Sequence, residues 1–204
     1  MRNKLGNLCI LLGAALVFCA LTLFSYNQRE ASAAEQSVQV LLPQVQQQIQ
    51  KRQEVSAVLP GTPAELLTPE DVQMTEVVID GYAYIGYLSI PALALELPVM
   101  SQWDYERLKT APCRYAGSTK SDDLVLLAHN YAKHFGTLKN LVPGDAVYFT
   151  DMDEEISRYE VVLVEILPPE AVEEMVAGEY DLTLFTCTYG GENRVTIRCD
   201  RVKD

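Results

Sequence analysis

From Gly81 onward the chain is a series of short β-prone runs separated by turn residues, and this spacing limits the possible folds more than any other feature. The runs are rich in Val, Ile, Leu, Tyr and Thr, as strands are. Many short strands at regular spacing, with few helices, favour a mainly β fold built as a closed or nearly closed antiparallel barrel. The predicted strands are residues 82–90, 93–100, 123–129, 145–151, 158–167, 181–187 and 194–199, and the predicted short helices or helical turns are 104–109, 134–141 and 168–177.

An uncharged apolar run occupies residues 8–24 and is about as long as the lower limit for a membrane-spanning helix. Arg2 and Lys4 precede the run, and positively charged flanks stay in the cytoplasm, so the rest of the chain is expected outside the cell. The alternative is a cleaved signal peptide, because residues 31–34 (ASAA) resemble a cleavage site. The length of the apolar run favours an uncleaved anchor, and both interpretations export the remainder.

Residues 34–78 have the composition of a stalk. Val38, Leu41, Val45 and Ile49 lie at helical spacing in a Gln-rich segment. Pro43 interrupts this pattern, so we expect a loose helix or one that needs a partner. Prolines and a glycine at 60–69 predict a linker. The predicted division is a cytoplasmic N-terminus (1–7), a transmembrane anchor or signal peptide (8–26), a stalk and linker (27–80) and a globular domain (81–204).

The chain is acidic, with a net charge of -12 over 204 residues. Such a surface argues against a nucleic-acid partner. It would also be repelled by anionic lipid, so any attachment to membrane lipid must be hydrophobic, and the N-terminal helix is expected to provide it. With 2 histidines and no C-x-x-C pair, a structural zinc site is not expected.

Three of the 5 cysteines, Cys113, Cys187 and Cys199, lie outside the apolar run. In an oxidising compartment Cys113 and Cys199 could form a disulfide. Two packed thiols are equally consistent with the sequence.

Cys187 stands at the end of an apolar run, where a strand stops and the chain becomes exposed. A nucleophilic thiol needs such access, together with a neighbouring base or cation. His129 ends the run 123–129 in the same way, so the thiol and the imidazole would meet if the two strands were neighbours ending at one rim. Arg194 opens the next strand, and a hairpin would return its guanidinium beside the thiol to stabilise an oxyanion.

Each candidate also has an ordinary structural interpretation. Cys187 could be a packed residue, His129 a hydrogen-bonded core histidine and Arg194 a surface arginine. By strand alternation Arg198 shares a face with Arg194 and is the second candidate for the arginine role. His134, at the start of a predicted helical turn, is expected to have a surface or capping role.

Three segments carry a family resemblance. TLFTCTY (183–189), followed by an arginine that opens the next strand, resembles the T-L-x-T-C…R signature of the sortases. LLAHN (126–130) before FGTLKNLVPGD (135–145) resembles the region of the sortase catalytic histidine. YIGYLSIPALALELPV (84–99) resembles the first two strands of that family. The order of anchor, stalk and domain is also that of many sortases.

The resemblance implies a closed eight-stranded sortase-type β-barrel and a membrane-anchored cysteine transpeptidase. Cys187 would attack the carbonyl of a threonine in the sorting motif of a secreted protein, His129 would protonate the leaving amine, and Arg194 would hold the substrate and the oxyanion. An amine acceptor, from a cell-wall precursor or a pilin-type lysine, would then take the acyl group. This chemistry requires no cofactor. Calcium binding occurs in some family members, and no residue here is assigned to it.

The sortase subclass and two alternative functions stay open. No Asp-Pro-aromatic lid motif precedes the barrel, which favours wall anchoring over pilin polymerisation. A non-catalytic membrane-tethered binding module and a cysteine protease are the alternative functions.

The segment LPGTP (59–63) resembles the sorting motif L-P-x-T-G with Pro63 in the last position. It could act as a tethered inhibitor that cannot be cut, and an ordinary linker is the simpler interpretation.

Overall fold

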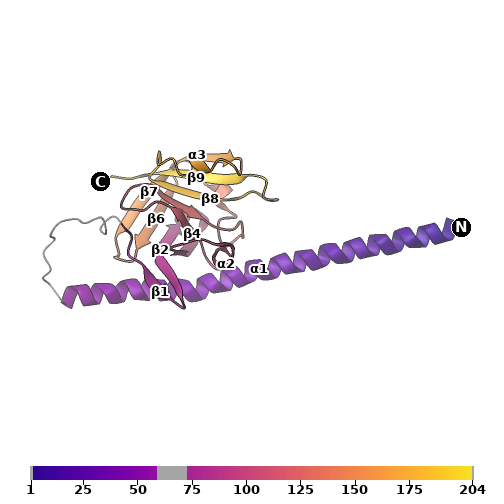
Figure 1. Cartoon of the computed structure of the whole chain (residues 1–204), viewed down its shortest axis with the longest axis horizontal. Helices are drawn as coiled ribbons and strands as arrows, with labels where there is room; N and C mark the ends of the chain where they lie inside the picture. The colour runs from indigo at the N-terminus through magenta and orange to yellow at the C-terminus, as the bar shows by residue number, and fades with distance from the viewer. Residues whose placement is uncertain (1, 59–72, 204) are drawn as a thin grey trace.

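The structure is a computed structural model that describes residues 2–58 and 73–203. The LPGTP segment lies outside the described residues. A long N-terminal helix runs along one side of a β-barrel (Figure 1). The elements in chain order are α1 (Arg2–Val58), β1 (Val77–Ile79), β2 (Tyr82–Ile90), η2 (Pro91–Leu93), β3 (Leu95–Met100), α2 (Tyr105–Leu108), β4 (Cys113–Ala116), β5 (Leu124–Leu127), η3 (Leu138–Asn140), β6 (Ala146–Asp151), β7 (Ile156–Leu167), α3 (Val172–Met175), β8 (Leu182–Cys187) and β9 (Arg194–Arg201).

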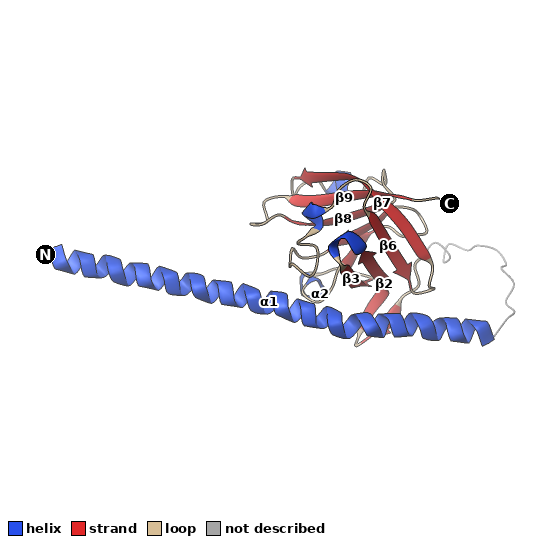
Figure 2. Ribbon diagram, turned by 180° about the vertical axis from the view of Figure 1, so that it is seen from behind, coloured by secondary structure: helices blue, strands red, loops and turns tan. Residues whose placement is uncertain are grey.

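The predicted fold class is confirmed, because eight strands close into a barrel. The strand order is β1-β2-β3-β4-β5-β8-β9-β7-β6, and an additional pairing of β2 with β6 closes the ring. Strand β1 lies outside this ring and, among the described strands, pairs only with β2. Figure 2 shows the closed barrel from behind, with the short helices at its ends and sides. The interior is filled by aliphatic and aromatic side chains such as Ile85, Leu88, Phe149, Leu184 and Ile197.

The expectation of antiparallel pairing throughout the barrel is wrong. Strand β3 pairs parallel with β4, and β5 pairs parallel with β8. Two parallel strands need a long crossover between them. For β5 and β8 that crossover contains η3, β6, β7 and α3. The run-by-run pattern predicted every strand except β1 and β4, and it could not predict which strands pair.

The closure of the barrel depends on a glycine. Strand β2 pairs with β3 along one edge and with β6 along the other. At Gly86, where φ is +145°, an added Cβ would lie 2.1 Å from the backbone carbonyl oxygen of Thr150 in β6. Only glycine fits this approach, since such a φ and such a contact both exclude a side chain.

The helices outside α1 are shorter than the sequence predicts. Helix α2 is a single turn, and Asp104 caps it by accepting a hydrogen bond from the backbone N–H of Arg107 at 2.7 Å. Helix α3 is also one turn, and the helical turn expected at 134–141 is reduced to the 3₁₀ segment η3. Strand β4 has four residues and was not predicted.

Of the two expectations for the stalk, a loose helix or one that needs a partner, the second is observed, because α1 continues through Pro43 without interruption and packs on the barrel. The helix has found its partner in the barrel of the same chain. Leu41, Val45 and Ile49 are buried against residues of β1, β2 and β3, including Tyr84. Burial of each such side chain contributes about 1.5–3 kcal/mol. We attribute the continuity to this packing, which offsets the hydrogen bond that Pro43 cannot make.

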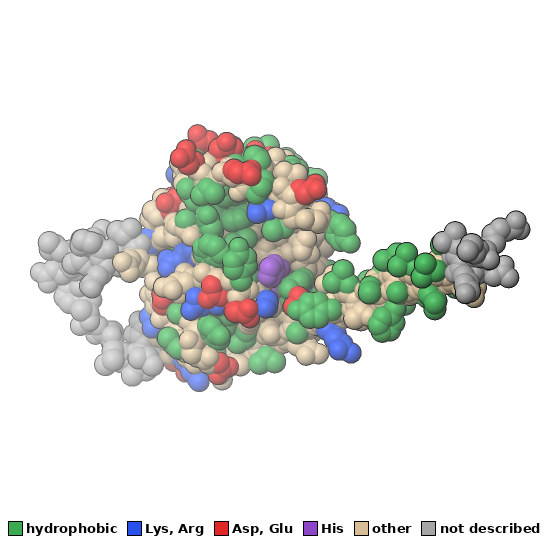
Figure 3. Space-filling model, turned by 45° about the vertical axis from the view of Figure 1, so that its right-hand side comes forward, with side chains coloured by type: hydrophobic (Ala, Val, Ile, Leu, Met, Phe, Trp, Pro, Cys, Tyr) green, Lys and Arg blue, Asp and Glu red, His purple; other side chains and the backbone are tan. Residues whose placement is uncertain are grey.

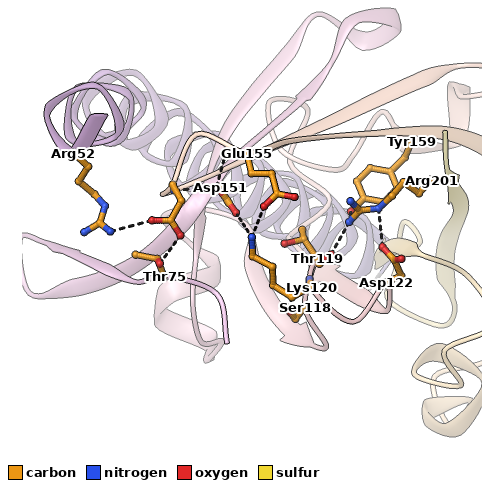
Figure 4. A network of polar contacts seen from close by, with 11 residues as sticks. Arg52, Thr75, Ser118, Thr119, Lys120, Asp122, Asp151, Glu155, Tyr159 and Arg201 are labelled. Atoms are coloured by element: carbon orange, nitrogen blue, oxygen red, sulfur yellow. Dashed lines mark hydrogen bonds and ion pairs between the residues drawn. The ribbon is translucent and has the colours of Figure 1, made fainter. Parts of the chain in front are cut away.

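Polar contacts fix α1 to the end of the barrel that carries the β6–β7 turn (Figure 4). Arg52 of α1 pairs with Asp153 at 3.0 Å, and Thr75 donates to the same carboxylate at 2.6 Å. In the same network Lys120 pairs with Asp151 and Glu155. Arg52 lies near the C-terminal end of α1. These contacts therefore place the C-terminal end of the helix at the barrel end that carries the β6–β7 turn.

Within the described residues, α1 is the one helix long and apolar enough to span a membrane. Its most apolar 18-residue window has a mean hydropathy of 2.5 and is 0% buried. Figure 3 shows hydrophobic side chains along the part of the helix that projects beyond the barrel. The division of the chain into anchor, stalk and domain stays a prediction.

Candidate active site

The parallel pairing of β5 with β8 brings the two candidate segments to one rim. In this register Leu127 lies opposite Phe185. Two residues after these positions the chain reaches His129 in one segment and Cys187 in the other. Because parallel strands end at the same edge of a sheet, the imidazole and the thiol lie at the same end of the barrel. The thiol and the imidazole could meet only if these two strands were neighbours that end at one rim, and the topology meets this condition.

Hydrogen bonds tie the two strand exits together on both sides of His129. The N–H of Ala128 donates to the carbonyl of Phe185 at 3.3 Å. Thr186 Oγ1 donates to the carbonyl of Ala128 at 2.8 Å. On the other side, Asn130 Nδ2 donates to the carbonyl of Thr188 at 3.4 Å. The residues flanking His129 are therefore bonded to the residues flanking Cys187, which holds the two segments in register.

Arg194 lies directly across the β8–β9 pair from Cys187. Its Nη1 donates to the carbonyls of Gly191 at 3.0 Å and Asn193 at 3.1 Å, both within the turn that joins the strands. Among the described residues no carboxylate forms an ion pair with this guanidinium. Nε and Nη2 donate to no group in the described part of the chain, so they are free to bind a ligand.

A groove with a cavity of about 190 Å³ joins these residues on the outer face of the sheet. Phe185 and Cys187 point to this face, whereas Leu184, the residue before Phe185, points into the barrel core. Cys187, His129 and Arg194 all line the groove, so the three predicted site residues share one cavity. The other side chains in its wall are mostly apolar: Trp103, Tyr105, Leu108, Tyr115, Leu127, Ala128, Pro169, Ala171, Val172, Met175 and Phe185.

The aromatic wall of the groove was missed in the sequence analysis. Trp103 and Tyr115 have ring centroids 5.6 Å apart, and Tyr115 meets Phe185 edge-on at 5.2 Å. These residues come from the loop before α2, from β4 and from β8. A tryptophan in a polar loop was the only available signal, since nothing in the sequence places β4 beside β5.

His129 is half-buried at the mouth of the groove, and its ring lies 5.0 Å from that of Tyr131. Burial lowers the pKa of His129 below its ordinary value, and the nearby carboxylate of Glu30 in α1 opposes this shift. The imidazole is therefore mainly neutral at neutral pH, as a group that accepts a proton from a thiol should be.

His134 is fully buried, and the expectation of a surface or capping role is wrong. Burial and the neighbouring His129 lower the pKa of His134 to about 4. Its ring lies 5.6 Å from that of Tyr131, which also lies 5.0 Å from the ring of His129. His134 does not line the groove. It is a core histidine that stays neutral.

Arg198 is also a buried structural residue. Its Nε donates to Glu165 at 2.8 Å, and Nη1 donates to Thr183 Oγ1 at 3.0 Å. Its other bonds reach the carbonyls of Glu174 at 2.9 Å and Met175 at 3.3 Å. Arg198 thus fixes α3 to the sheet beneath it. Of the two candidate arginines, only Arg194 lines the groove.

Cys113 and Cys199 are free, buried thiols. They belong to separate clusters, Cys199 in the barrel interior and Cys113 under α1. Burial raises the pKa of Cys113 to about 12 and raises the pKa of Cys199 as well. The sequence was consistent with a disulfide between them or with two packed thiols, and the structure contains two packed thiols.

The family follows from comparison with known proteins. The model of the sortase domain matches residues 88–202, which is more than half of the 204 residues. The chain belongs to the sortase family. It is 27% identical to sortase A of Bacillus anthracis over 136 residues, which is 61% of this chain and 62% of that protein.

Solved sortase structures share the fold. Sortase C1 of Streptococcus suis is 28% identical, with a TM-score of 0.51 over 59% of this chain and 74% of that one. Sortase A of Corynebacterium diphtheriae is 18% identical, with a TM-score of 0.56 over 87% and 94%. Sortase C of Streptococcus pneumoniae is 23% identical, with a TM-score of 0.54 over 78% and 89%. Since both A and C types appear, the subclass stays open.

Proposed function

We propose that this protein is a membrane-anchored cysteine transpeptidase. It would cleave a sorting motif in a secreted protein through a thioester and transfer the acyl part to an amine acceptor. The observation that carries the proposal is the single groove lined by Cys187, His129 and Arg194, which come from three neighbouring strand ends. Membership of the sortase family supports a transpeptidase role in general.

In the first half of the reaction the proton of Cys187 moves to His129, and the sulfur attacks the carbonyl carbon of the scissile peptide. Negative charge develops on the carbonyl oxygen, where the unbonded donors of Arg194 would stabilise it. The C–N bond then breaks with its electron pair on nitrogen, and the imidazolium of His129 donates its proton to that nitrogen. The products are a thioester on Cys187 and a free amine.

In the second half an acceptor amine attacks the thioester carbonyl. Neutral His129 takes the proton that the amine nitrogen must lose, and the C–S bond breaks with its electron pair on sulfur. A new amide leaves, and the proton on His129 returns to the thiolate. Every proton and electron pair is accounted for by the thiol, the imidazole and the two substrates. The reaction as proposed needs no metal or organic cofactor, and calcium stays unassigned.

The apolar wall of the groove suits the acyl substrate. Trp103, Tyr115 and Phe185 form a continuous aromatic surface leading to the thiol. A short, extended peptide with apolar side chains upstream of the scissile bond would bury those side chains there. We therefore propose that specificity lies upstream of the scissile bond and that the acceptor enters from the open side of Cys187.

Localisation follows from the apolar part of α1. We propose that the helix crosses the cell membrane once and that the barrel lies on the extracellular side, since positively charged residues precede the apolar run. The partners would be secreted proteins with a C-terminal sorting motif, an amine acceptor such as a peptidoglycan precursor, and membrane lipid around α1.

The decisive experiment is incubation of the protein with a library of sorting-motif peptides and a set of amines, followed by mass spectrometry. Amide products that contain the amine support transpeptidation. Products formed with water alone would favour a cysteine protease. No product, and no acyl adduct on Cys187, would favour a binding module. The Cys187→Ala variant is the control, because it keeps the groove and removes the nucleophile.

A further inference from the structure

The part of α1 that lies beyond the barrel leaves it on the side of the groove. In both ribbon views α2 and the β8–β9 turn point toward the N-terminal part of α1 (Figures 1 and 2). The apolar residues of that part are exposed, with Phe18 at 72% and Phe24 at 63%. The groove and the membrane-spanning part of the helix are therefore on the same side of the barrel.

Contacts with α1 place the groove end of the barrel close to the C-terminal end of the apolar run (residues 8–24). Ala34 is buried at 1% exposure, and Glu35 pairs with Lys133 at 3.9 Å. Phe24 precedes Ala34 by ten residues, which is about 15 Å along a helix. In between, Tyr26 donates to Glu30 at 2.6 Å, and Glu30 lies near enough to His129 to oppose the lowering of its pKa by burial. The groove is thus held within a few helical turns of the apolar segment.

The opposite end of the barrel, which carries the β6–β7 turn, is held far from the apolar segment of α1. Arg52 pairs with Asp153 in the β6–β7 turn at 3.0 Å. The 26 residues from Tyr26 to Arg52 correspond to about 39 Å along the helix. Since α1 packs on the barrel through Leu41, Val45 and Ile49, the helix fixes which end faces a membrane.

The groove end of the barrel carries exposed aromatic side chains. Tyr189 in the β8–β9 turn is 101% exposed, Tyr105 at the start of α2 is 74% exposed, and Trp103 is 40% exposed. Tyrosine and tryptophan are enriched at membrane interfaces, because their rings enter the headgroup layer while their polar ends stay hydrated. Contact made through such rings does not require anionic lipid, which suits a protein with a net charge of -12.

We propose that the active-site rim, defined as the β8–β9 turn with Tyr189 and the start of α2 with Trp103 and Tyr105, rests on the headgroup layer of the bilayer that α1 spans. The occupant of this surface is the lipid bilayer. The groove then opens at the membrane surface, so the sorting motif and the amine reach Cys187 along that surface. The proposal rests on the anchoring role of α1 and is independent of the chemistry at Cys187.

The test uses the whole protein and its single tryptophan, Trp103. The chain is reconstituted in phosphatidylcholine vesicles containing a lipid with a nitroxide quencher on its headgroup. Two variants move the tryptophan, Trp103→Phe with Tyr189→Trp for the rim and Trp103→Phe with Ile156→Trp for the distal end. Ile156 is 63% exposed at the start of β7, beside the β6–β7 turn, so the added indole does not disturb the core.

Flotation with the vesicles is measured first, and circular dichroism checks that each variant is folded. We expect all three proteins to float and the tryptophans at 103 and 189 to be quenched at least about threefold more than the one at 156. Flotation without stronger quenching at 189 than at 156 overturns the docked rim and leaves the anchor in place. Quenching at 103 alone also overturns it, because the β8–β9 turn would then point away from the lipid. Failure to float overturns the anchor and the docking together.

Discussion

Cys187 and Arg194 face each other as direct partners in the antiparallel register of β8 and β9. Directly opposed residues send their side chains to the same face of a sheet. The hairpin that joins them is therefore enough to set the thiol beside the guanidinium. His129 has to be delivered separately, by the parallel strand β5. One short-range and one long-range pairing together make the groove.

The two arginines of β9 should separate activity from stability. In Arg194→Lys we expect a loss of kcat/KM of about 100-fold with an unchanged melting temperature, because a lysine lacks the guanidinium fork that can bind two oxygens. In Arg198→Lys we expect a stability loss of about 2–4 kcal/mol, because the bonds to Glu165, Thr183 and α3 cannot all be kept. Peptide turnover and thermal unfolding of both variants measure this. If Arg198→Lys is the variant that loses turnover while staying folded, the assignment of the arginine role is reversed.

Removal of the thiol should abolish transfer without disturbing the fold. Cys187 is the final residue of β8 and is only half-buried, so Cys187→Ala should melt within about 2 °C of the parent. Acyl transfer should fall by more than about 1,000-fold. Mass spectrometry of the thioester and the amide product measures both steps. Substantial turnover by this variant would remove Cys187 from the mechanism.

Alkylation should distinguish the three thiols of the barrel. In the folded protein iodoacetamide should modify Cys187 and spare Cys113 and Cys199, because those two are buried and their pKa values are raised. In denaturant all three should react. Peptide mapping after short exposure gives the result, and early modification of Cys113 would show that the face under α1 opens readily.

The two histidines should have opposite phenotypes. His129→Ala should lose about 100- to 10,000-fold in rate, as expected for a general acid and base. His134→Phe should keep most of the activity, since His134 does not line the groove. Steady-state kinetics on a peptide substrate at one pH makes the comparison. A larger rate loss in the folded His134 variant would transfer the acid–base role to that residue.

His134 should also make stability fall in mild acid. Its pKa is about 4 in the folded protein and about 6.5 in an unfolded chain, so between these values the unfolded state binds the proton first. The stabilising contribution of neutral His134 is complete above about pH 6.5 and is lost toward pH 4, at up to about 1.4 kcal/mol per pH unit. Denaturant titrations between pH 7 and 5 should show a shallower pH dependence in His134→Phe. Equal slopes in both proteins would contradict the buried neutral state.

The packing of α1 is tested by two valines that lie five residues apart. Val45 is 0% exposed and Val40 is 60% exposed on the same helix. Val45→Ala should cost about 2 kcal/mol of stability through lost burial and a residual cavity. Val40→Ala should cost less than about 0.5 kcal/mol. If both substitutions are equally mild, the helix does not stabilise the barrel.

The sequence predicted local structure well where side-chain pattern decides it. The β2 run was placed with its observed limits, and β8 and β9 were placed within two residues. These strands are rich in β-branched, aromatic and leucine residues, so the strand signal in the sequence is strong. Strand β4 has four residues, three of them only half-buried, and it carries no such signal.

The sequence pattern could not show which residues contact one another across the fold. The helical spacing of Leu41, Val45 and Ile49 predicted an amphipathic helix without showing what would cover it. Strand alternation placed Arg198 on the correct face of the sheet. It could not reveal that Glu165 and α3 are its hydrogen-bond partners. For His129 and Cys187 the position at strand ends was visible, and their meeting depended on a pairing between distant segments. Contacts made across the fold are absent from any local window.

The parallel pairing of β5 with β8 also determines when during biosynthesis the thiol can gain its imidazole. Thr186 and Ala128, which are hydrogen-bonded in the finished barrel, are 58 residues apart in the chain. Closing so long a loop is slow compared with forming a hairpin. A polypeptide made from its N-terminus has His129 available early, but the site stays incomplete until β8 has been synthesised and inserted beside β5. If Cys187 and His129 act as proposed, the nascent chain is an inert precursor during its assembly, and reactivity appears together with the finished barrel.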